Sequence, residues 1–299
     1  MLDQDLIHRF RVEPGTKFRL KDHDTGWAQT KELKELGKEL VKEKAKEILE
    51  QNIAELAEAQ QVLYADDRYS LLIVFHAMDA AGKDGTIRHV MSGVNPQGCQ
   101  VYSFKRPSAE ELDHNFLWRF MRRLPERGNI GIFNRSYYED VLVVKVHPEL
   151  LDQQKLPDGK RGRSLWEARY EDINAFEKHL VRNGTVVLKF FLNVSKDEQK
   201  KRFLERLERP EKNWKFSAAD LVERAYWDDY VAAFEDAITA TSTEWAPWYV
   251  IPADHKWATR SVVAEIIAGT LKGLDLRYPE PGAEELARLA EARAKLESE

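Results

Sequence analysis

One segment restricts the possible folds of this chain more than any other: an apolar run, a short loop with a glycine and a lysine, and the start of a helix. The run is residues 71–75 (LLIVF), and residues 77–86 (AMDAAGKDGT) follow it. Such a loop turns successive backbone N–H groups inward, and the helix that follows adds its positive end. Lys83 adds a mobile cation for phosphate oxygens. The segment therefore predicts a phosphate-binding strand–loop–helix unit.

The loop follows the phosphate-binding template GxxxxGK[ST] in part. Gly82 and Lys83 match the second glycine and the lysine of this P-loop template. Ala77 stands where the first glycine is expected, and Asp84 replaces the hydroxyl residue that usually holds Mg²⁺. Because Asp79 and Asp84 flank the lysine, a metal would be held differently here. The alternative is an ordinary turn with a solvated lysine, which the strand–loop–helix context disfavours.

Composition and charge exclude several classes of protein. The 299 residues are 43% hydrophobic and 32% charged, and no apolar run approaches the roughly 18 to 20 residues that span a bilayer. Residues 1–5 lack the basic and apolar parts of a signal peptide. The single cysteine, Cys99, excludes an internal disulfide, and one cysteine is typical of a cytoplasmic protein. We expect Cys99 to be a small apolar residue at the start of a strand. Because the net charge is −5, any affinity for a polyanion must come from local clusters of cations.

Apolar runs alternate with helical patterns along most of the chain. Residues 1–29 are expected to be an extended arm, and residues 32–65 one long amphipathic helix whose apolar stripe covers the core or a partner subunit. Further strands are expected at 100–104, 129–133, 186–194 and 248–251, helices at 109–124, 165–183, 196–208, 218–240 and 257–274, and a polar helical tail at 283–299. Strands that alternate with helices indicate a parallel sheet covered on both faces.

Three polar segments directly follow three of the expected strands. They are residues 79–83, residues 105–108 (KRPS) and residues 134–140 (NRSYYED). In an open parallel sheet, ligands bind beyond the carboxyl ends of the strands, so we expect these segments to converge. Phosphoryl transfer requires positioning and cations around the phosphate oxygens. Lys83 can bridge donor and acceptor phosphates, and the guanidinium of Arg135 fits a phosphate through two hydrogen bonds.

Carboxylates in the same segments are candidate ligands for Mg²⁺. Asp79, Glu139 and Asp140 supply oxygen atoms, directly or through water. Helix capping is the alternative role for Glu139 and Asp140, and a structural ion pair is the alternative for Arg135. Asn134 can hold a metal-bound water or a phosphate, but it brings no charge. His147 and His255 have no companions at metal-ligand spacing, which disfavours a zinc site.

Two basic segments predict a binding surface for a long polyanion. Residues 200–216 (KKRFLERLERPEKNWKF) place cations at helical spacing and then break at a proline, as in a lid that closes over phosphates. Residues 116–124 (FLWRFMRRL) add a second basic face. The candidate channel residues are Arg119, Arg122, Arg123, Lys201, Arg202, Arg206, Arg209, Lys212 and Lys215. The alternative is a solvated helix with Glu–Arg pairs four residues apart.

Taken together, these motifs closely resemble the polyphosphate kinase 2 family over roughly residues 24–276. The carriers are residues 78–85 (MDAAGKDG), 103–108 (SFKRPS), 134–141 (NRSYYEDV) and the lid-like residues 201–216. The resemblance implies a thymidylate-kinase-like α/β fold, a P-loop kinase-like parallel sheet sandwiched by helices, with a helical lid. It also implies transfer of a terminal phosphoryl group between inorganic polyphosphate and a nucleotide with Mg²⁺ or Mn²⁺, and a homodimer or homotetramer.

The same resemblance assigns roles to single residues. Lys83 would be the phosphate-bridging lysine, Asp79 the acid that organises Mg²⁺ or the acceptor phosphate, and Arg135 a phosphate contact; these three are the expected catalytic residues. The form of residues 134–141 resembles the subgroup that phosphorylates both AMP and ADP, with Glu139 handling the shorter acceptor. The expected nucleotide- and phosphate-binding residues are Ala80, Ala81, Gly82, Asp84, Gly85, Thr86, Lys105, Arg106, Asn134 and Glu139.

Two other functions stay open at this point. A conventional ATP-dependent nucleotide kinase would share the loop but ignore polyphosphate, and a non-catalytic protein could bind polyanions through the basic helices. The negative net charge and the lack of an aromatic–basic RNA motif disfavour nucleic acid as a partner. Guanine nucleotides stay open as further acceptors. We expect an arm and helix over 1–65, a kinase core over 66–278 with the lid at about 200–220, and a tail over 279–299.

Overall fold

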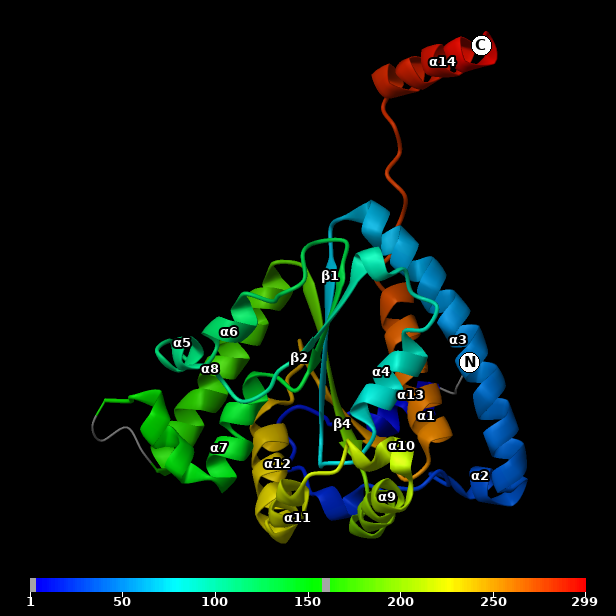
Figure 1. Cartoon of the computed structure of the whole chain (residues 1–299). Helices are drawn as coiled ribbons and strands as arrows, with labels where there is room; N and C mark the ends of the chain where they lie inside the picture. Colours follow the sequence, from blue (N-terminus) through cyan, green and yellow to red (C-terminus); the bar gives the residue numbers. More distant parts are fainter. Residues whose placement is uncertain (1–3, 158–161) are drawn as a thin grey trace.

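A five-stranded parallel sheet forms the centre of the protein (Figure 1). The computed structural model describes residues 4–157 and 162–299. The strands are β1 (Ser70–Ala77), β2 (Cys99–Ser103), β3 (Ile130–Asn134), β4 (Thr185–Asn193) and β5 (Trp248–Pro252), and their order in the sheet is β2-β3-β1-β4-β5. β1 and β3 are buried along almost their whole length, because helices cover both faces of the sheet. All neighbouring strands are parallel, which confirms the expected α/β class.

Helices form the two outer layers. α3, α4 and α13 lie on one side of the sheet, and α7 and α8 lie on the other (Figure 1). The helices are α1 (Gln4–Phe10), α2 (Lys31–Leu36), α3 (Lys38–Asp66), α4 (Lys83–Val90), α5 (Ala109–Leu112), α6 (Trp118–Met121), α7 (Val143–Val146), α8 (Arg163–Arg182), α9 (Lys196–Glu208), α10 (Pro210–Asn213), α11 (Ala218–Ala225), α12 (Trp227–Thr241), α13 (Lys256–Lys272) and α14 (Ala283–Glu297), with 3-10 turns at Leu20–Asp22, Pro96–Gly98, Tyr137–Asp140 and Pro148–Gln154. Within the described residues, no helix combines the length and the apolar character that crossing a bilayer requires.

Three of the expected helices are broken, which corrects the sequence prediction. Gly37 separates α2 from α3 with a φ of 80°, a left-handed conformation that glycine adopts without steric cost. The expected helix over 109–124 is two short helices, because the side chain of Asn115 accepts a hydrogen bond from the N–H of Leu117 and competes with helical bonding. The expected helix over 218–240 is interrupted at Tyr226.

The N-terminal segment is part of the core, contrary to the expected extended arm. Residues 4–10 form helix α1, and the side chains of Phe10, Val12 and Phe18 are buried. The N–H of Val12 donates to the carbonyl of Trp248 at 2.8 Å, so the segment lies along the edge strand β5. Covering an edge strand in this way satisfies backbone groups that would otherwise face solvent. The expected boundary at residue 65 does not separate two packing units either, because α3 packs along α13.

Helix α14 does not pack against the rest of the protein. Every residue from 277 to 299 is exposed, and α14 stands away from the main body (Figure 1). Its helical state agrees with the expected polar tail, although the helix ends at Glu297.

A buried ion pair joins the sheet to the turn that carries the polar segment 134–140. Nζ of Lys189 in β4 lies 2.6 Å from Glu177 Oε2 in α8, and both side chains are fully buried. The hydroxyls of Tyr137 and Tyr138 each donate to Glu177 Oε1 at 2.9 Å, and Lys189 also donates to the carbonyl of Thr241. Burial lowers the pKa of Lys189, and Glu177 opposes this shift. The network therefore anchors the turn Tyr137–Asp140 to the core.

We expect the substitution Lys189→Met to lower the free energy of unfolding by about 3–5 kcal/mol, because it leaves the carboxylate of Glu177 buried without a cation. Equilibrium unfolding in guanidinium chloride measures this change. The matched control is Arg163→Ala, which removes an exposed ion pair with Glu167 on the same helix and should cost about 0.5 kcal/mol or less. Equal losses in both variants would show that the buried pair does not anchor the core.

Candidate active site

The phosphate-binding loop connects β1 to α4 through two left-handed residues. Ala80 has a φ of 59° and Gly82 has a φ of 106°. Left-handed residues in such a turn are typical of backbone concavities that bind anions. Gly82 directly precedes α4, and the N–H of Thr86 donates to the Gly82 carbonyl at 2.9 Å, so Gly85 and Thr86 lie in the first turn of the helix. The side chain of Thr86 is buried beneath the loop.

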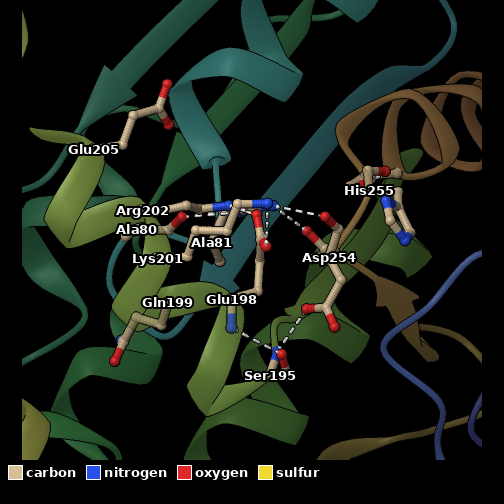
Figure 2. A network of polar contacts seen from close by, with 12 residues as sticks. Ala80, Ala81, Ser195, Glu198, Gln199, Lys201, Arg202, Glu205, Asp254 and His255 are labelled. Carbon is tan, nitrogen blue, oxygen red and sulfur yellow. Dashed lines mark hydrogen bonds and ion pairs between the residues drawn. The ribbon is translucent and has the colours of Figure 1, made fainter. Parts of the chain in front are cut away.

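The guanidinium of Arg202 binds this loop to the rest of the fold (Figure 2). Nη1 of Arg202 donates to the carbonyls of Ala80 at 3.0 Å and Ala81 at 2.7 Å. Nη2 of the same residue donates to the carbonyls of Ala253 at 2.6 Å and Asp254 at 3.2 Å. Arg202 therefore connects α9, the phosphate-binding loop and the loop that leads from β5 to α13. The left-handed conformation at Ala80 costs free energy, and these bonds offset that cost.

Arg202 was expected to line a polyphosphate channel, and in the structure its guanidinium is occupied by contacts within the protein. Its side chain is only 6% exposed, and its Nε donates to Glu198 at 2.8 Å, so all of its nitrogens are engaged within the protein. Gln199 adds a further bond from α9, since its Nε2 donates to the carbonyl of Asp79 at 3.0 Å. Arg202 and Gln199 are positioning residues for the loop.

Four charged residues of the candidate site meet where β1 and β3 end. The parallel register places Phe75 opposite Asn134, so the residues that follow both strands come together. Nη2 of Arg135 lies 3.5 Å from Asp79 Oδ1, and Nη1 lies 3.6 Å from Glu139 Oε2. Lys83 donates to the carbonyl of Ala77 at 3.3 Å. The structure thus brings together Lys83, Asp79, Arg135 and Glu139, as the sequence predicted.

The pKa values of these groups reflect burial and mutual charge. Burial and then the nearby Arg135 lower the pKa of Lys83, while three carboxylates oppose the shift. Glu139 raises the pKa of Arg135, which stays charged. Burial raises the pKa of Glu139 despite the attraction of Arg135 and Lys83. Such crowded charges of both signs are typical of sites that bind a charged ligand.

Asn134 holds a carboxylate in place. Its Nδ2 donates to Asp84 Oδ1 at 2.6 Å and to Ser103 Oγ at 3.4 Å. The amide therefore links the ends of β2 and β3 to the first turn of α4. Asn134 was expected to hold a metal-bound water or a phosphate. In the structure its Nδ2 is instead hydrogen-bonded to Asp84.

His76 is a residue of this site that sequence reasoning missed. The ring is buried in β1, with Nε2 at 2.8 Å from Ser136 Oγ and Nδ1 at 3.4 Å from Glu139 Oε1. Burial lowers the pKa of His76 well below its ordinary value, so the ring is neutral. A neutral ring that donates from Nδ1 to Glu139 and accepts from Ser136 fits these contacts. The signal in the sequence is one polar residue inside an otherwise apolar strand.

Two cavities meet at the charged cluster. The larger has a volume of about 710 Å³ and extends between α5, α7 and α8, where Lys105, Arg106 and Arg119 line it. The smaller, of about 270 Å³, lies beside the phosphate-binding loop and α12. Arg135 and Glu139 line both cavities. A volume of this size, with cations in its lining, suits a nucleotide in the larger cavity.

Asp140 does not join the other two expected metal ligands. Its Oδ1 accepts from Gln154 Nε2 at 2.7 Å and faces Arg169 at 3.9 Å, because Arg169 also donates to the Asp140 carbonyl. Among residues 4–157 and 162–299, no group of three His, Cys, Asp or Glu side chains could hold a metal ion by itself. Mg²⁺ commonly takes one or two carboxylates and completes its shell with phosphate oxygens and water. Asp79 and Glu139 fit that arrangement.

Most of the expected channel cations have partners within the protein. The lid segment contains the ion pairs Lys201–Glu198 (3.7 Å), Arg206–Asp220 (3.3 Å), Arg209–Glu205 (3.1 Å) and Lys212–Glu205 (2.5 Å), while Arg122 stacks on Trp118, Arg123 on Tyr102 and Lys215 on Trp214. Carboxylates within the protein therefore neutralise part of the positive charge of the lid segment, and one of these pairs, Arg209–Glu205, is of the expected Glu–Arg kind four residues apart. Of the cations in the segment 116–124, Arg119 lines the larger cavity.

The parallel sheet, the phosphate-binding loop and the converging charges define a phosphotransferase with a P-loop kinase-like fold. The family model described as Polyphosphate kinase 2 (PPK2) matches residues 39–278, and the chain belongs to this family. The protein is therefore an enzyme, which removes the alternative of a non-catalytic polyanion-binding protein.

Individual relatives agree with this assignment. The chain is 55% identical to an ADP-polyphosphate phosphotransferase of Rhodopseudomonas palustris over 256 residues, which cover 85% of this chain and 89% of the relative. It is 46% identical to an AMP/ADP-polyphosphate phosphotransferase of Meiothermus ruber over 275 residues, which cover 92% and 96%. The crystal structure of polyphosphate kinase 2 from Arthrobacter aurescens TC1 superposes with a TM-score of 0.82 at 41% identity, covering 95% of each chain.

We expect Arg202→Lys to loosen the phosphate-binding loop, because an ammonium group cannot replace a fork that reaches four carbonyls. Hydrogen exchange followed by mass spectrometry should show peptides over residues 77–90 exchanging about tenfold faster, which corresponds to about 1.4 kcal/mol in the free energy of opening. Arg206→Lys, on the next turn of α9, is the control and should leave these peptides unchanged. Unchanged exchange in Arg202→Lys would contradict the positioning role.

Proposed function

We propose that this protein transfers the terminal phosphoryl group of inorganic polyphosphate to AMP and to ADP, forming ADP and ATP. The observation that carries the proposal is that Arg135 and Glu139 line both cavities. A nucleotide in the larger cavity and the end of a polyphosphate at the loop would meet beside these two residues. The names of the relatives from R. palustris and M. ruber support ADP as an acceptor, and the second name also supports AMP.

The chemistry requires little from the side chains beyond positioning and charge. An oxygen of the acceptor's terminal phosphate would attack the end phosphorus of polyphosphate, and the bond to the rest of the polymer would break in line with the attack. Phosphate oxygens are already anionic, so no strong base is required. Lys83 and the loop N–H groups would contact the transferred phosphoryl group, and Arg135 would hold its oxygens through two hydrogen bonds.

The proposal includes Mg²⁺, with Mn²⁺ as the alternative ion. Asp79 and Glu139 would hold it, and the bound ion would neutralise charge on phosphate oxygens. A cytoplasmic location and a homodimer or homotetramer belong to the same proposal. The single cysteine supports the location. Leu36 and Leu40, which are 44% and 43% exposed, support contact with a second subunit.

Nucleotide turnover tests this function directly. Purified protein receives Mg²⁺ and long-chain polyphosphate with AMP, ADP, GMP or GDP in separate reactions, and anion-exchange chromatography resolves the products. We expect ADP and then ATP from AMP, and ATP from ADP. Lys83→Ala should lower the rate by about a thousandfold with an unchanged melting temperature, because Lys83 makes one bond, to the Ala77 carbonyl.

Each other outcome has a distinct meaning. Product from ADP alone would contradict AMP as an acceptor and leave the donor assignment intact. Turnover that requires ATP as the donor and ignores polyphosphate would instead establish a conventional nucleotide kinase. Near-normal turnover by Lys83→Ala would contradict the assignment of the phosphate-binding loop.

The dependence of turnover on Mg²⁺ concentration tests whether Glu139, and not Asp140, is the metal ligand. We expect a chelator to abolish turnover, and Glu139→Gln to raise the Mg²⁺ concentration for half-maximal rate by about tenfold, since a ligand oxygen loses its charge. Asp140→Asn is the matched control, because Asp140 faces Gln154 and Arg169. Its half-maximal Mg²⁺ concentration should stay unchanged. A larger shift in Asp140→Asn than in Glu139→Gln would reverse the assignment of the two carboxylates.

A further inference from the structure

The ring of His76 lies between β1 and the turn that follows β3. It is buried, and it packs edge-on against the rings of Tyr138 and Trp248, with centroid separations of 5.8 Å and 6.3 Å. Both of these aromatic side chains are themselves fully buried. Side chains in such a closely packed interior have little freedom to move. The packing therefore holds the imidazole in one orientation, with its nitrogens towards residues 136–139.

The partners of His76 determine which of its nitrogens carries the proton. Nδ1 lies 3.4 Å from Glu139 Oε1, and an ionised carboxylate only accepts hydrogen bonds. Nδ1 is therefore the protonated nitrogen of the neutral ring, and Nε2 accepts from the hydroxyl of Ser136 at 2.8 Å. The same hydroxyl accepts from the N–H of Tyr138 at 3.3 Å. A directed series of contacts thus leads from the backbone of the turn through the ring to Glu139.

Glu139 has a second partner at its other oxygen. Oε2 lies 3.6 Å from Nη1 of Arg135, and Nη2 of Arg135 lies 3.5 Å from Asp79 Oδ1. Both distances exceed the roughly 2.7–2.9 Å of a close charged hydrogen bond. The guanidinium therefore stands between two carboxylates without a tight bond to either of them.

An arginine and a carboxylate this close would normally form a tighter pair. They favour a geometry with two parallel hydrogen bonds, and their attraction is stronger at a buried site than in water. Arg135 and Glu139 are four residues apart in one turn, so the chain permits the approach. A Glu139 carboxylate with no other partner would turn both oxygens to the guanidinium. In this structure Oε1 faces His76 instead, so the ring opposes closure of the pair.

We propose that His76 is a positioning residue that keeps Glu139 from closing onto Arg135. This proposal rests on the proposed function. Arg135 then stays open to phosphate oxygens, and Oε2 of Glu139 stays open to a divalent cation. His76 is not among the described residues that line the two cavities, whereas Arg135 and Glu139 line both. The ring therefore acts on the site through Glu139.

A crystal structure of the His76→Leu variant tests this geometry directly. Leucine offers no donor to the carboxylate, so we expect both oxygens of Glu139 to lie about 3 Å from the Arg135 guanidinium. A carboxylate that keeps its present place in the variant would overturn the proposal. This result does not depend on whether the protein uses polyphosphate, so failure of the positioning role and failure of the proposed function are distinguishable.

Two solution measurements on the same variant test the consequence for the site. Calorimetry with ADP and Mg²⁺ should give a Kd about tenfold higher in His76→Leu, because a closed pair occupies the guanidinium. The Mg²⁺ concentration for half-maximal turnover should also rise about tenfold. His76→Asn should restore both values to within about threefold, since its amide nitrogen can donate from near the position of Nδ1. Unchanged values in His76→Leu would reject the positioning role.

The Glu139→Gln background separates an effect through Glu139 from a general effect on packing. Glutamine forms no ion pair with Arg135, so adding His76→Leu in this background should change the Kd for ADP by less than about twofold. A tenfold loss in both backgrounds would contradict the proposal. Ser70→Ala is the matched control, because it removes a hydrogen bond to Thr185 at the other end of β1. Neither the Kd nor the Mg²⁺ dependence should change in this control.

Ser136→Ala provides the second variant if His76→Leu does not fold. It removes the hydroxyl that donates to Nε2 and leaves the ring in place. The ring is then held less firmly, so we expect the Kd for ADP to rise about threefold. A folded Ser136→Ala variant with an unchanged Kd would count against the positioning role.

Discussion

The parallel pairing of β1 with β3 is the constraint on which the site depends. It places Phe75 opposite Asn134, so the loop after β1 and the turn after β3 leave the sheet side by side. Arg135 can then reach both Asp79 and Glu139. The backbone of Arg135 is itself left-handed, with a φ of 67°, and its N–H donates to the carbonyl of Phe75. Strand register and local strain together determine where this guanidinium lies.

Two buried polar networks support the two halves of the site. Beneath the phosphate-binding loop, Arg202 binds four carbonyl oxygens and connects the loop to α9 and to the start of α13 (Figure 2). Beneath the turn Tyr137–Asp140, Lys189 and Glu177 hold both tyrosine hydroxyls. Buried charges of this kind are costly unless every partner is present, so both networks favour one arrangement of the chain.

The distribution of cations divides the molecule into regions with different electrostatic character. The lid segment contains many cations, but most of them face carboxylates or aromatic rings at its surface. The face of α4 and α13 contains fewer cations, and Arg88, Lys256 and Arg260 lack ion pairs among residues 4–157 and 162–299. A paired cation attracts a polyanion less strongly than an unpaired one. A count of basic residues in the sequence therefore overestimates the attraction of the lid segment for a polyanion.

The sequence by itself determined the strand–loop–helix unit, the α/β class and the convergence of Lys83, Asp79, Arg135 and Glu139, because these follow from local patterns and from the geometry of parallel sheets. The tertiary structure alone decided which partner each polar side chain finds. Arg202 binds Ala80, which lies 122 residues away in the chain, and Asp140 turns towards Arg169 on α8. The sequence also left the positions of His76 and Lys189 unexplained, since their partners come from distant segments. Contacts between residues far apart in the sequence depend on how the helices pack against the sheet. A local sequence pattern does not contain this information.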